Sequence, residues 1–295
     1  MKLVYGVKDK PSFGKTLVFA LQQLLAILAA TIAVPAIIGN GMSQSAALFG
    51  AGVGTIVYLL FTKFRSPVFL GSSFAFLGSM AAAFAGGVSA SAGYLGMIIG
   101  AVMAGLVYVV IALIVKFAGV KWISKLMPAV VIGPTVAIIG LSLSGNAIGD
   151  AVGVAKDGGA FVMNAHAGVC LICALVTLAV TMLSSVFGKK MMKMIPFIIG
   201  IVSGYIVASI FTIIGNNTGI DALKIIDYSA FSNLRWVPSF TFETAFSGGY
   251  DFGDAGSIAS YIGTIAAAYV PVAFVVFAEH IADHNNISTI IEHDL

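Results

Sequence analysis

Long runs of apolar residues that are almost free of charge constrain this chain more than any other feature. A run of about 20 apolar residues is long enough to cross the hydrocarbon core of a bilayer as a helix. Seven such runs precede residue 215, and they cover residues 16–38, 43–61, 68–85, 94–115, 129–148, 167–187 and 195–214. An eighth lies between residues 258 and 290. Charged residues make up 9% of the chain, against about 25% in a soluble domain, which excludes a soluble fold. The sequence predicts an all-α polytopic membrane protein with about eight transmembrane segments.

The basic residues fall on alternate sides of the predicted membrane. Connections on one side carry twelve of the 15 lysines and arginines: Lys2, Lys8, Lys10, Lys15, Lys63, Arg65, Lys116, Lys121, Lys125, Lys189, Lys190 and Lys193. The other side carries Lys156, Lys224 and Arg235. Cytoplasmic loops hold the excess of basic residues, so both termini are predicted to be cytoplasmic. No cleavage site follows the basic start, so we expect a multi-pass protein of the inner (plasma) membrane that keeps its first segment.

The last apolar segment carries carboxylates in the sequence Phe277-Ala278-Glu279-His280, followed by Asp283. Residues four apart share one face of a helix, so Glu279 and Asp283 are predicted to point into the same space. A carboxylate at membrane depth costs roughly 2.5–3.5 kcal/mol, so it faces a protein interior or a wet cavity. A helix that begins near Ile258 puts Glu279 close to the cytoplasmic boundary, where a charge costs little. A helix that begins near Tyr269 puts Glu279 near mid-membrane, and the Gly- and Ser-rich stretch before Tyr269 favours this second position.

The third apolar segment is predicted to be discontinuous. It begins with Pro67 and a run of aromatic and β-branched residues, and Gly71-Ser72-Ser73 then precedes Phe74. These residues favour extended backbone, which at membrane depth must be covered by protein or line a cavity. A short extended stretch followed by a half-helix exposes N–H groups at the positive end of the helix dipole. The alternative is an unbroken helix that is rich in small residues.

The two features together suit a flat heterocycle with adjacent N–H and C=O groups, such as a pyrimidinedione. Glu279 can accept hydrogen bonds from its N–H groups. Backbone amides near Phe74 can donate to its carbonyl oxygens, and the ring of Phe74 or Phe76 can stack on it. A sulfate or similar anion does not fit, because an ionised Glu279 would repel it. Burial favours the uncharged form of a carboxyl group, so Glu279 could take up and release a proton during transport.

Three motifs carry a resemblance to a known family. They are Leu21-Gln22-Gln23-Leu24 with the following Ala30–Pro35 stretch, Leu70–Phe76, and Phe277–His280. With them the chain resembles the uracil/xanthine permease family, also called the nucleobase–ascorbate transporters, and is most similar to its bacterial uracil permease branch. The resemblance implies fourteen membrane segments in two inverted repeats of seven, which form a core domain and a gate domain.

The resemblance also implies domain limits and site residues. Residues 1–127 would hold core segments one to four, 128–214 gate segments five to seven, 215–257 an extracytoplasmic connection, and 258–295 core segment eight. Glu279 would hydrogen-bond the base, with Ser73 and Phe74 beside it. Gln23 stands where many members have His, so it could only hydrogen-bond. Asp283 stands where the uracil branch often has His, and with Glu279 and His280 it is a candidate for proton coupling.

The chain stops after the eighth predicted segment, so we expect a truncated product that holds the first repeat and one further segment. The function predicted from the resemblance is proton-coupled symport of a nucleobase, uracil foremost, by alternating access. An inactive or non-transporting membrane fragment is the alternative, and a sulfate-permease-like anion carrier a more distant one. Nothing in the sequence supports an enzyme, a nucleic-acid partner or a cofactor other than the proton, and a homodimer is possible for a full-length form.

Two clusters of metal-binding residue types have simpler explanations. His280 and His284 share the four-residue spacing of a helical face, but Asp283 is their only obvious third ligand, so no metal site is predicted. Cys170 and Cys173 lie inside an apolar segment without polar ligands, and we expect them to pack as free thiols rather than form a disulfide.

Overall fold

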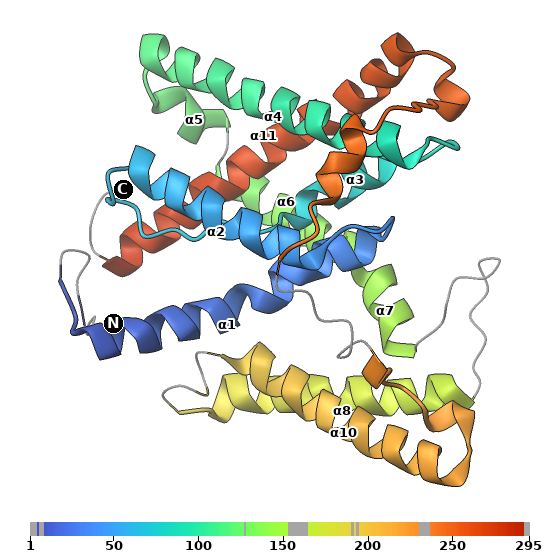
Figure 1. Ribbon diagram of the computed structural model, residues 1–295. Helices are drawn as coiled ribbons and strands as arrows, with labels where there is room; N and C mark the ends of the chain where they lie inside the picture. The colour runs from blue at the N-terminus through green and yellow to red at the C-terminus, as the bar shows by residue number, and fades with distance from the viewer. Residues whose placement is uncertain are drawn as a thin grey trace. The chain divides into compact units, whose positions relative to one another are not determined.

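The computed structural model describes residues 5, 9–126, 128–152, 165–189, 192, 195–229 and 237–291 (Figure 1). Over these ranges the fold is helical, as predicted. Six helices are long and apolar enough to cross a membrane: α1 (Phe13–Ile38), α2 (Gln44–Phe61), α4 (Ala90–Ala118), α8 (Ala165–Phe187), α10 (Pro196–Thr218) and α11 (Ile258–Ile291). Shorter helices connect them: η1 (Phe74–Phe76), α3 (Leu77–Ala83), α5 (Lys121–Leu126), α6 (Ala129–Ser142), α7 (Ser144–Val152), η2 (Asp221–Leu223), η4 (Thr241–Phe246) and η5 (Gly253–Ala255). The chain is therefore a multi-pass membrane protein.

Local capping sets the helix limits close to those predicted. The Ser43 hydroxyl accepts a hydrogen bond from the Ala46 amide at the start of α2, and Ser89 does the same for Ala92 at the start of α4. Such side chains satisfy amide groups that have no partner within the first helical turn. At the other end of a helix, Gly219 follows α10 with φ of 74°, a left-handed conformation that glycine adopts without strain.

The third predicted segment is broken, so the alternative of an unbroken helix is wrong. Residues 65–73 contain no helix, and Ser73 has extended dihedral angles, φ −93° and ψ 123°. Helical structure resumes only at Phe74, in η1 and the seven-residue α3. The Pro67 ring and the Gly71-Ser72-Ser73 sequence disfavour helix over this stretch.

Two expectations about continuous helices are wrong. The predicted segment 129–148 is divided between α6 and α7 at Leu143, where neighbouring serines offer the backbone competing hydrogen bonds. The last helix begins at Ile258 rather than near Tyr269, and it runs through Pro271. Glu279 therefore lies about two thirds of the way along α11, and this start corresponds to the alternative in which Glu279 is close to the predicted cytoplasmic boundary rather than near mid-membrane. At about 1.5 Å per residue this 34-residue helix is about 50 Å long, longer than a hydrocarbon core of about 30 Å.

The chain divides into two compact units. The first comprises residues 1–10, 30–141 and 238–295, and the second comprises residues 11–29 and 142–237. In the first unit, Ala83, Tyr261, Ile265 and Tyr269 form a buried cluster where α11 packs against α3 and α4. In the second unit, α8 packs along α10. The assignment of residue ranges to a core and a gate domain stays a prediction.

Small residues allow the close packing in both units. Gly96 and Gly100 of α4 leave room for the rings of Tyr261 and Tyr269, and a Cβ atom at either glycine would collide with the ring. In the second unit Gly200 and Gly204 face threonine side chains of α8 in the same way. Such contacts hold helices together in lipid, where no hydrophobic driving force acts between them.

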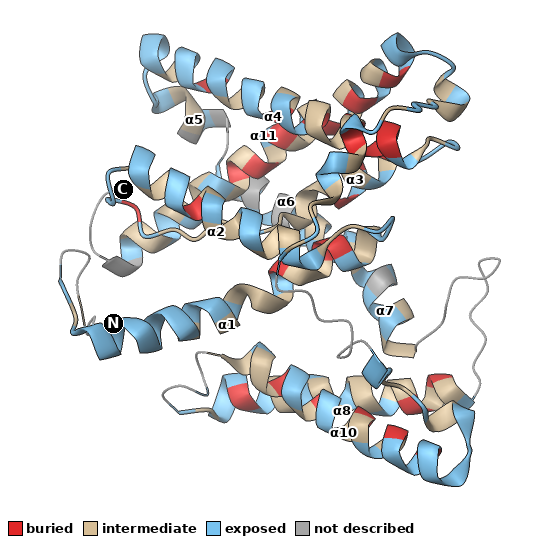
Figure 2. Cartoon of the chain, viewed as in Figure 1, coloured by how far each residue is buried: buried red, intermediate tan, exposed pale blue. Residues whose placement is uncertain are grey.

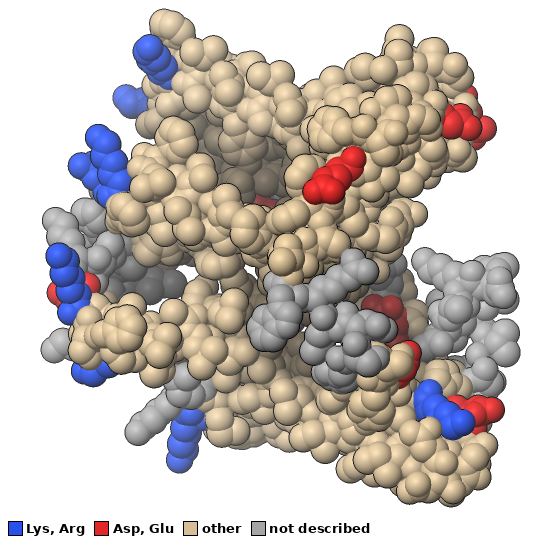
Figure 3. Space-filling view, viewed as in Figure 1, with Lys and Arg blue, Asp and Glu red and all other residues tan. Residues whose placement is uncertain are grey.

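Exposed residues run along α2, α4, α8 and α10 (Figure 2), and many of them are large apolar side chains. Exposed side chains include Ile56 and Leu60 of α2, Leu106 and Val110 of α4, and Leu178 of α8. Lipid is the solvent that such faces require. Basic residues of the first unit lie in the last turn of α4 and just after α2 and α4, and Figure 3 shows the lysine and arginine side chains at the surface. Lys156 and Arg235 lie outside the described residues, and the predicted orientation stays a prediction.

Candidate solute site

Glu279 lies half-buried on α11, beside Tyr108 of α4. The Tyr108 hydroxyl is 3.0 Å from Nδ1 of His280, and its ring meets that of Phe277 edge-on, with centroids 5.8 Å apart. The surroundings of the carboxylate in the first unit thus include the polar and aromatic side chains of Tyr108, Phe277 and His280, from α4 and α11.

Side chains of neighbouring helices hold the extended stretch before η1. The Leu70 amide donates to Oγ1 of Thr55, at 3.0 Å, and Thr55 itself is buried. The Ser72 hydroxyl donates to the carbonyl oxygen of Thr31, at 3.0 Å. A Cβ atom on Gly71 would approach Oγ1 of Thr31 to 3.2 Å, so a larger residue would push the stretch off α1. Neighbouring helices therefore hold this stretch at Leu70 and Ser72, whereas Pro67 and Gly71 are exposed.

The broken segment and α11 are packed together within the first unit. The ring of Phe76 stacks on that of Tyr269, with centroids 5.6 Å apart, and the Ser79 hydroxyl donates to the carbonyl oxygen of Ala268, at 2.7 Å. Ser73 and Phe74 are half-buried next to these contacts. The first amides of η1 have no partner within the helix, because a helix leaves its first N–H groups free. The roles of Ser73 and Phe74 toward a solute stay predictions.

The remaining predicted site residues are exposed. Gln23 is exposed on the part of α1 that belongs to the second unit. Asp283 is exposed, and His280 is exposed with its ring on Tyr108. In the part of the chain that the structure describes, no three His, Cys, Asp or Glu side chains are placed to hold a metal ion. Cys170 and Cys173 are free thiols.

Sequence reasoning missed two sets of aromatic and histidine partners. Tyr108 gave no signal because it lies in an apolar run far from α11 in sequence. His284 was noticed for its spacing from His280 only, yet its Nε2 atom lies 2.8 Å from the Tyr58 hydroxyl of α2. Both contacts join residues more than 170 positions apart, and one sequence gives no sign of them.

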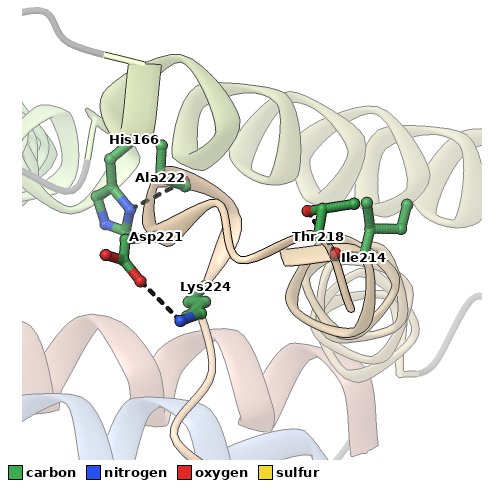
Figure 4. A network of polar contacts seen from close by, with 6 residues as sticks. All are labelled: His166, Ile214, Thr218, Asp221, Ala222 and Lys224. Carbon is green, nitrogen blue, oxygen red and sulfur yellow. Dashed lines mark hydrogen bonds and ion pairs between the residues drawn. The ribbon is translucent and has the colours of Figure 1, made fainter. Parts of the chain in front are cut away.

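The second unit has a separate polar network on the loop after α10 (Figure 4). Nδ1 of His166 donates to the Ala222 carbonyl, at 3.2 Å, and Lys224 forms an ion pair with Asp221, at 2.6 Å. The hydrogen bond and the charge of Lys224 lower the pKa of the Asp221 carboxyl. The network ties the loop to the start of α8, and it holds no predicted site residue.

A polytopic helical protein with a broken membrane segment packed against a helix that bears a carboxylate has the organisation of a secondary transporter. The chain belongs to the Permease family, the uracil/xanthine permeases that its motifs predicted, because the family model matches residues 14–295. This is a family of transporters rather than of enzymes.

Three curated relatives of the chain are named uracil permease. The chain is 37% identical over 297 residues to the uracil permease of Bacillus caldolyticus, covering 100% of this chain and 60% of that protein. It is 35% identical over 294 residues to the uracil permease of Bacillus subtilis (strain 168), covering 99% and 60%. It is 29% identical over 290 residues to that of Escherichia coli (strain K12), covering 98% and 58%. The chain spans about 60% of the length of these relatives.

Proposed function

We propose that the protein binds a nucleobase, uracil foremost, as part of a proton-coupled permease of the cytoplasmic membrane. The observation that carries the proposal is the half-buried Glu279 on α11, in the same packed unit as the extended stretch that ends at Ser73. The names of the relatives support uracil as the base.

The binding chemistry follows from complementary groups. Ionised Glu279 would accept hydrogen bonds from the ring N–H groups of uracil, while the Phe74 amide would donate to a ring carbonyl and the Phe74 ring would cover one face. Tyr108 and Phe277 would supply apolar surface beside the carboxylate. A carboxylate at this place repels sulfate and other anions, which argues against an anion carrier.

Proton coupling would use the same carboxylate. Protonation of Glu279 changes the hydrogen bonds that it can form with a base, so the binding of a proton and of a base at this group are linked, and each changes the affinity for the other by the same factor. His280 and the exposed Asp283 are the neighbouring groups that could exchange this proton with the cytoplasm. Gln23 would contribute a hydrogen bond only.

Uptake of radiolabelled uracil tests the proposed function. The host is a bacterial strain without uracil uptake of its own. It carries either this chain alone or this chain joined to the part of the Bacillus caldolyticus permease that the match does not cover. We expect saturable uptake by the joined protein that unlabelled uracil suppresses and sulfate does not. Suppression by sulfate, or no uptake by the joined protein, would contradict the proposal. Uptake by the chain alone would show that it transports by itself, and base binding without uptake would favour the non-transporting alternative.

A further inference from the structure

A second polar cluster joins three segments of the first unit near the ends of α2 and α11. It consists of Tyr58 on α2, Ser66 in the loop after α2, and His284 on α11. The Tyr58 hydroxyl lies 2.8 Å from Nε2 of His284 and 3.0 Å from Oγ of Ser66, and Ser66 lies 3.4 Å from the same Nε2. Ser66 is only 5% exposed. We call these three residues the Tyr58 cluster.

The ring of His284 is fixed on both sides. Its Nδ1 atom lies 2.8 Å from the carbonyl oxygen of His280, which can only accept, so Nδ1 carries a proton. In the neutral ring Nε2 accepts from the Tyr58 hydroxyl. In the charged ring Nε2 donates to the Tyr58 hydroxyl, and that hydroxyl donates its own hydrogen bond to Oγ of Ser66. Either proton arrangement lets Nε2 of His284 pair with the Tyr58 hydroxyl, so the contact joins α2 to α11 as a fixed link.

The cluster holds the start of the extended stretch. Ser66 directly precedes Pro67, and the stretch is also fixed at Leu70 by Thr55 of α2 and at Ser72 by α1. Among the polar contacts of residues 66–73, which the structure describes in full, the contact of Ser66 is the one that reaches α11. His284 follows Glu279 by five residues, a rise of about 7.5 Å along a helix.

The broken segment thus contacts α11 at two levels, with Glu279 between them. At one level the Tyr58 cluster joins Ser66 to His284, and at the other Phe76 and Ser79 meet Tyr269 and Ala268. An extended backbone has few internal hydrogen bonds to resist sliding along a neighbouring helix. Contacts at both ends would fix its register against the carboxylate.

We propose that the Tyr58 cluster is a positioning site that sets the register of the extended stretch against α11, and thereby the geometry of the solute site. Its bearing on the solute rests on the proposed function, whereas its effect on the register does not. Loss of the cluster should let the stretch move relative to Glu279 while both helices stay folded. Displacement of a hydrogen-bonding partner by about 1 Å is enough to weaken its hydrogen bond to a rigid ring.

Nitrogen NMR of the histidine rings tests the cluster itself. The chain is labelled with ring-¹⁵N histidine and held in lipid nanodiscs, and the His284 signals are assigned by their loss in His284→Gln. We expect Tyr58→Phe to shift the Nε2 signal of His284 and leave its Nδ1 signal, which reports the bond to His280, unchanged. Tyr205→Phe, at an exposed tyrosine of α10, is the matched control. An unchanged Nε2 signal in Tyr58→Phe would overturn the proposal.

Thiol reactivity tests the register. Ser73→Cys is introduced, the membranes are treated with a maleimide, and peptide mass spectrometry follows each thiol separately. Cys170 and Cys173, in the other unit, report any general loss of fold. We expect Tyr58→Phe and His284→Asn to change the rate at residue 73 at least threefold and leave the native thiols unchanged.

His284→Gln places an amide near the position of Nε2, whereas His284→Asn leaves that position empty. The Gln variant should therefore keep a rate close to that of the starting protein. Equal rates at residue 73 in all variants would refute the positioning role, and parallel changes at the native thiols would show unfolding instead of a change of register and refute it too.

Uracil binding by the matching variants that keep Ser73 links the register to the solute. We expect the variants with altered rates at residue 73 to require at least fivefold more uracil for half-saturation, and His284→Gln to recover most of the affinity. If the starting protein binds no uracil, the proposed function fails while the spectra and thiol rates still decide on the Tyr58 cluster. If affinity is unchanged in variants whose register has moved, the link to the solute site is wrong.

Discussion

Two buried tyrosines of α11, Tyr261 and Tyr269, should respond in opposite ways to substitution by phenylalanine. The Tyr261 hydroxyl donates to the carbonyl oxygen of Ala83, at 2.7 Å, and lies 3.1 Å from that of Ala92, so it joins α11 to the end of α3 and to α4. The Tyr269 hydroxyl is equally buried, but among the described residues it has no hydrogen-bond partner. Each ring packs against a glycine of α4.

Removal of the Tyr261 hydroxyl leaves a carbonyl at the end of α3 unpaired. The loss of a partner for a buried polar group costs about 1–3 kcal/mol in soluble proteins, and hydrogen bonds between membrane helices measure about 0.6 kcal/mol on average with a maximum near 1.7. We therefore expect Tyr261→Phe to lower the free energy of unfolding by about 1–2 kcal/mol, a factor of about 5–30 in the ratio of folded to unfolded protein. Tyr269→Phe removes a hydroxyl that is desolvated without compensation, so it should be neutral or stabilise by up to about 1 kcal/mol.

Reversible unfolding by SDS in mixed micelles, followed by circular dichroism, measures both values. Because both substitutions remove the same atom from the same helix, effects on the unfolded state cancel in the comparison. A loss of stability in Tyr269→Phe as large as that in Tyr261→Phe would refute the hydrogen-bond assignment and the packing of α11 on which it depends.

Three further predictions concern other parts of the fold. Thr55→Val should destabilise by about 1–2 kcal/mol in the same unfolding assay, because it leaves the amide of the extended stretch unpaired, whereas Thr55→Ser keeps the hydroxyl and should cost less. Gly100→Ala should cost about 1–3 kcal/mol by collision with the tyrosine ring of α11, and Gly105→Ala, where a Cβ meets no atom within 4 Å, should be neutral; equal costs would contradict the packing. The lowered pKa of Asp221 means that its ion pair with Lys224 stabilises the loop above the ordinary pKa of aspartate and loses this effect as pH falls through the lowered value, below about pH 4. Hydrogen exchange of residues 221–226 should show this loss, and Asp221→Asn should abolish it.

Most of the membrane-spanning helices could be predicted because apolar length is a local signal. The limits of α2 and α4 lie within four residues of the apolar runs predicted for them. The broken third segment was also predictable, because Pro67 and the Gly-Ser-Ser sequence act on the backbone directly. The start of α11 was not, because the small residues before Tyr269 look like a loop until α3 and α4 cover them with a close-packed interface.

The site could be predicted in part for the same reason. The motif around Phe74 predicted the extended stretch, which the structure confirms, whereas the roles of Glu279 and Phe74 toward a solute stay predictions. Tyr108 and the Tyr58 cluster could not be found, because each depends on contacts between helices far apart in sequence. The membrane depth of Glu279 depended on where α11 starts, so an error in one helix limit became an error about the site.

Uracil binding by Glu279 variants tests the central claim most directly. The joined protein described above is compared with its Glu279→Gln and Glu279→Asp forms, and with Glu243→Gln, which changes an exposed carboxylate of η4, as the matched control. A hydrogen bond to a charged group is worth about 1.5–3 kcal/mol, so Glu279→Gln should weaken uracil binding by about tenfold to more than a hundredfold. Glu279→Asp should retain part of the affinity, and Glu243→Gln all of it. Uracil affinity and accumulation unchanged in Glu279→Gln, with the protein present in the membrane at its usual level, would contradict the account.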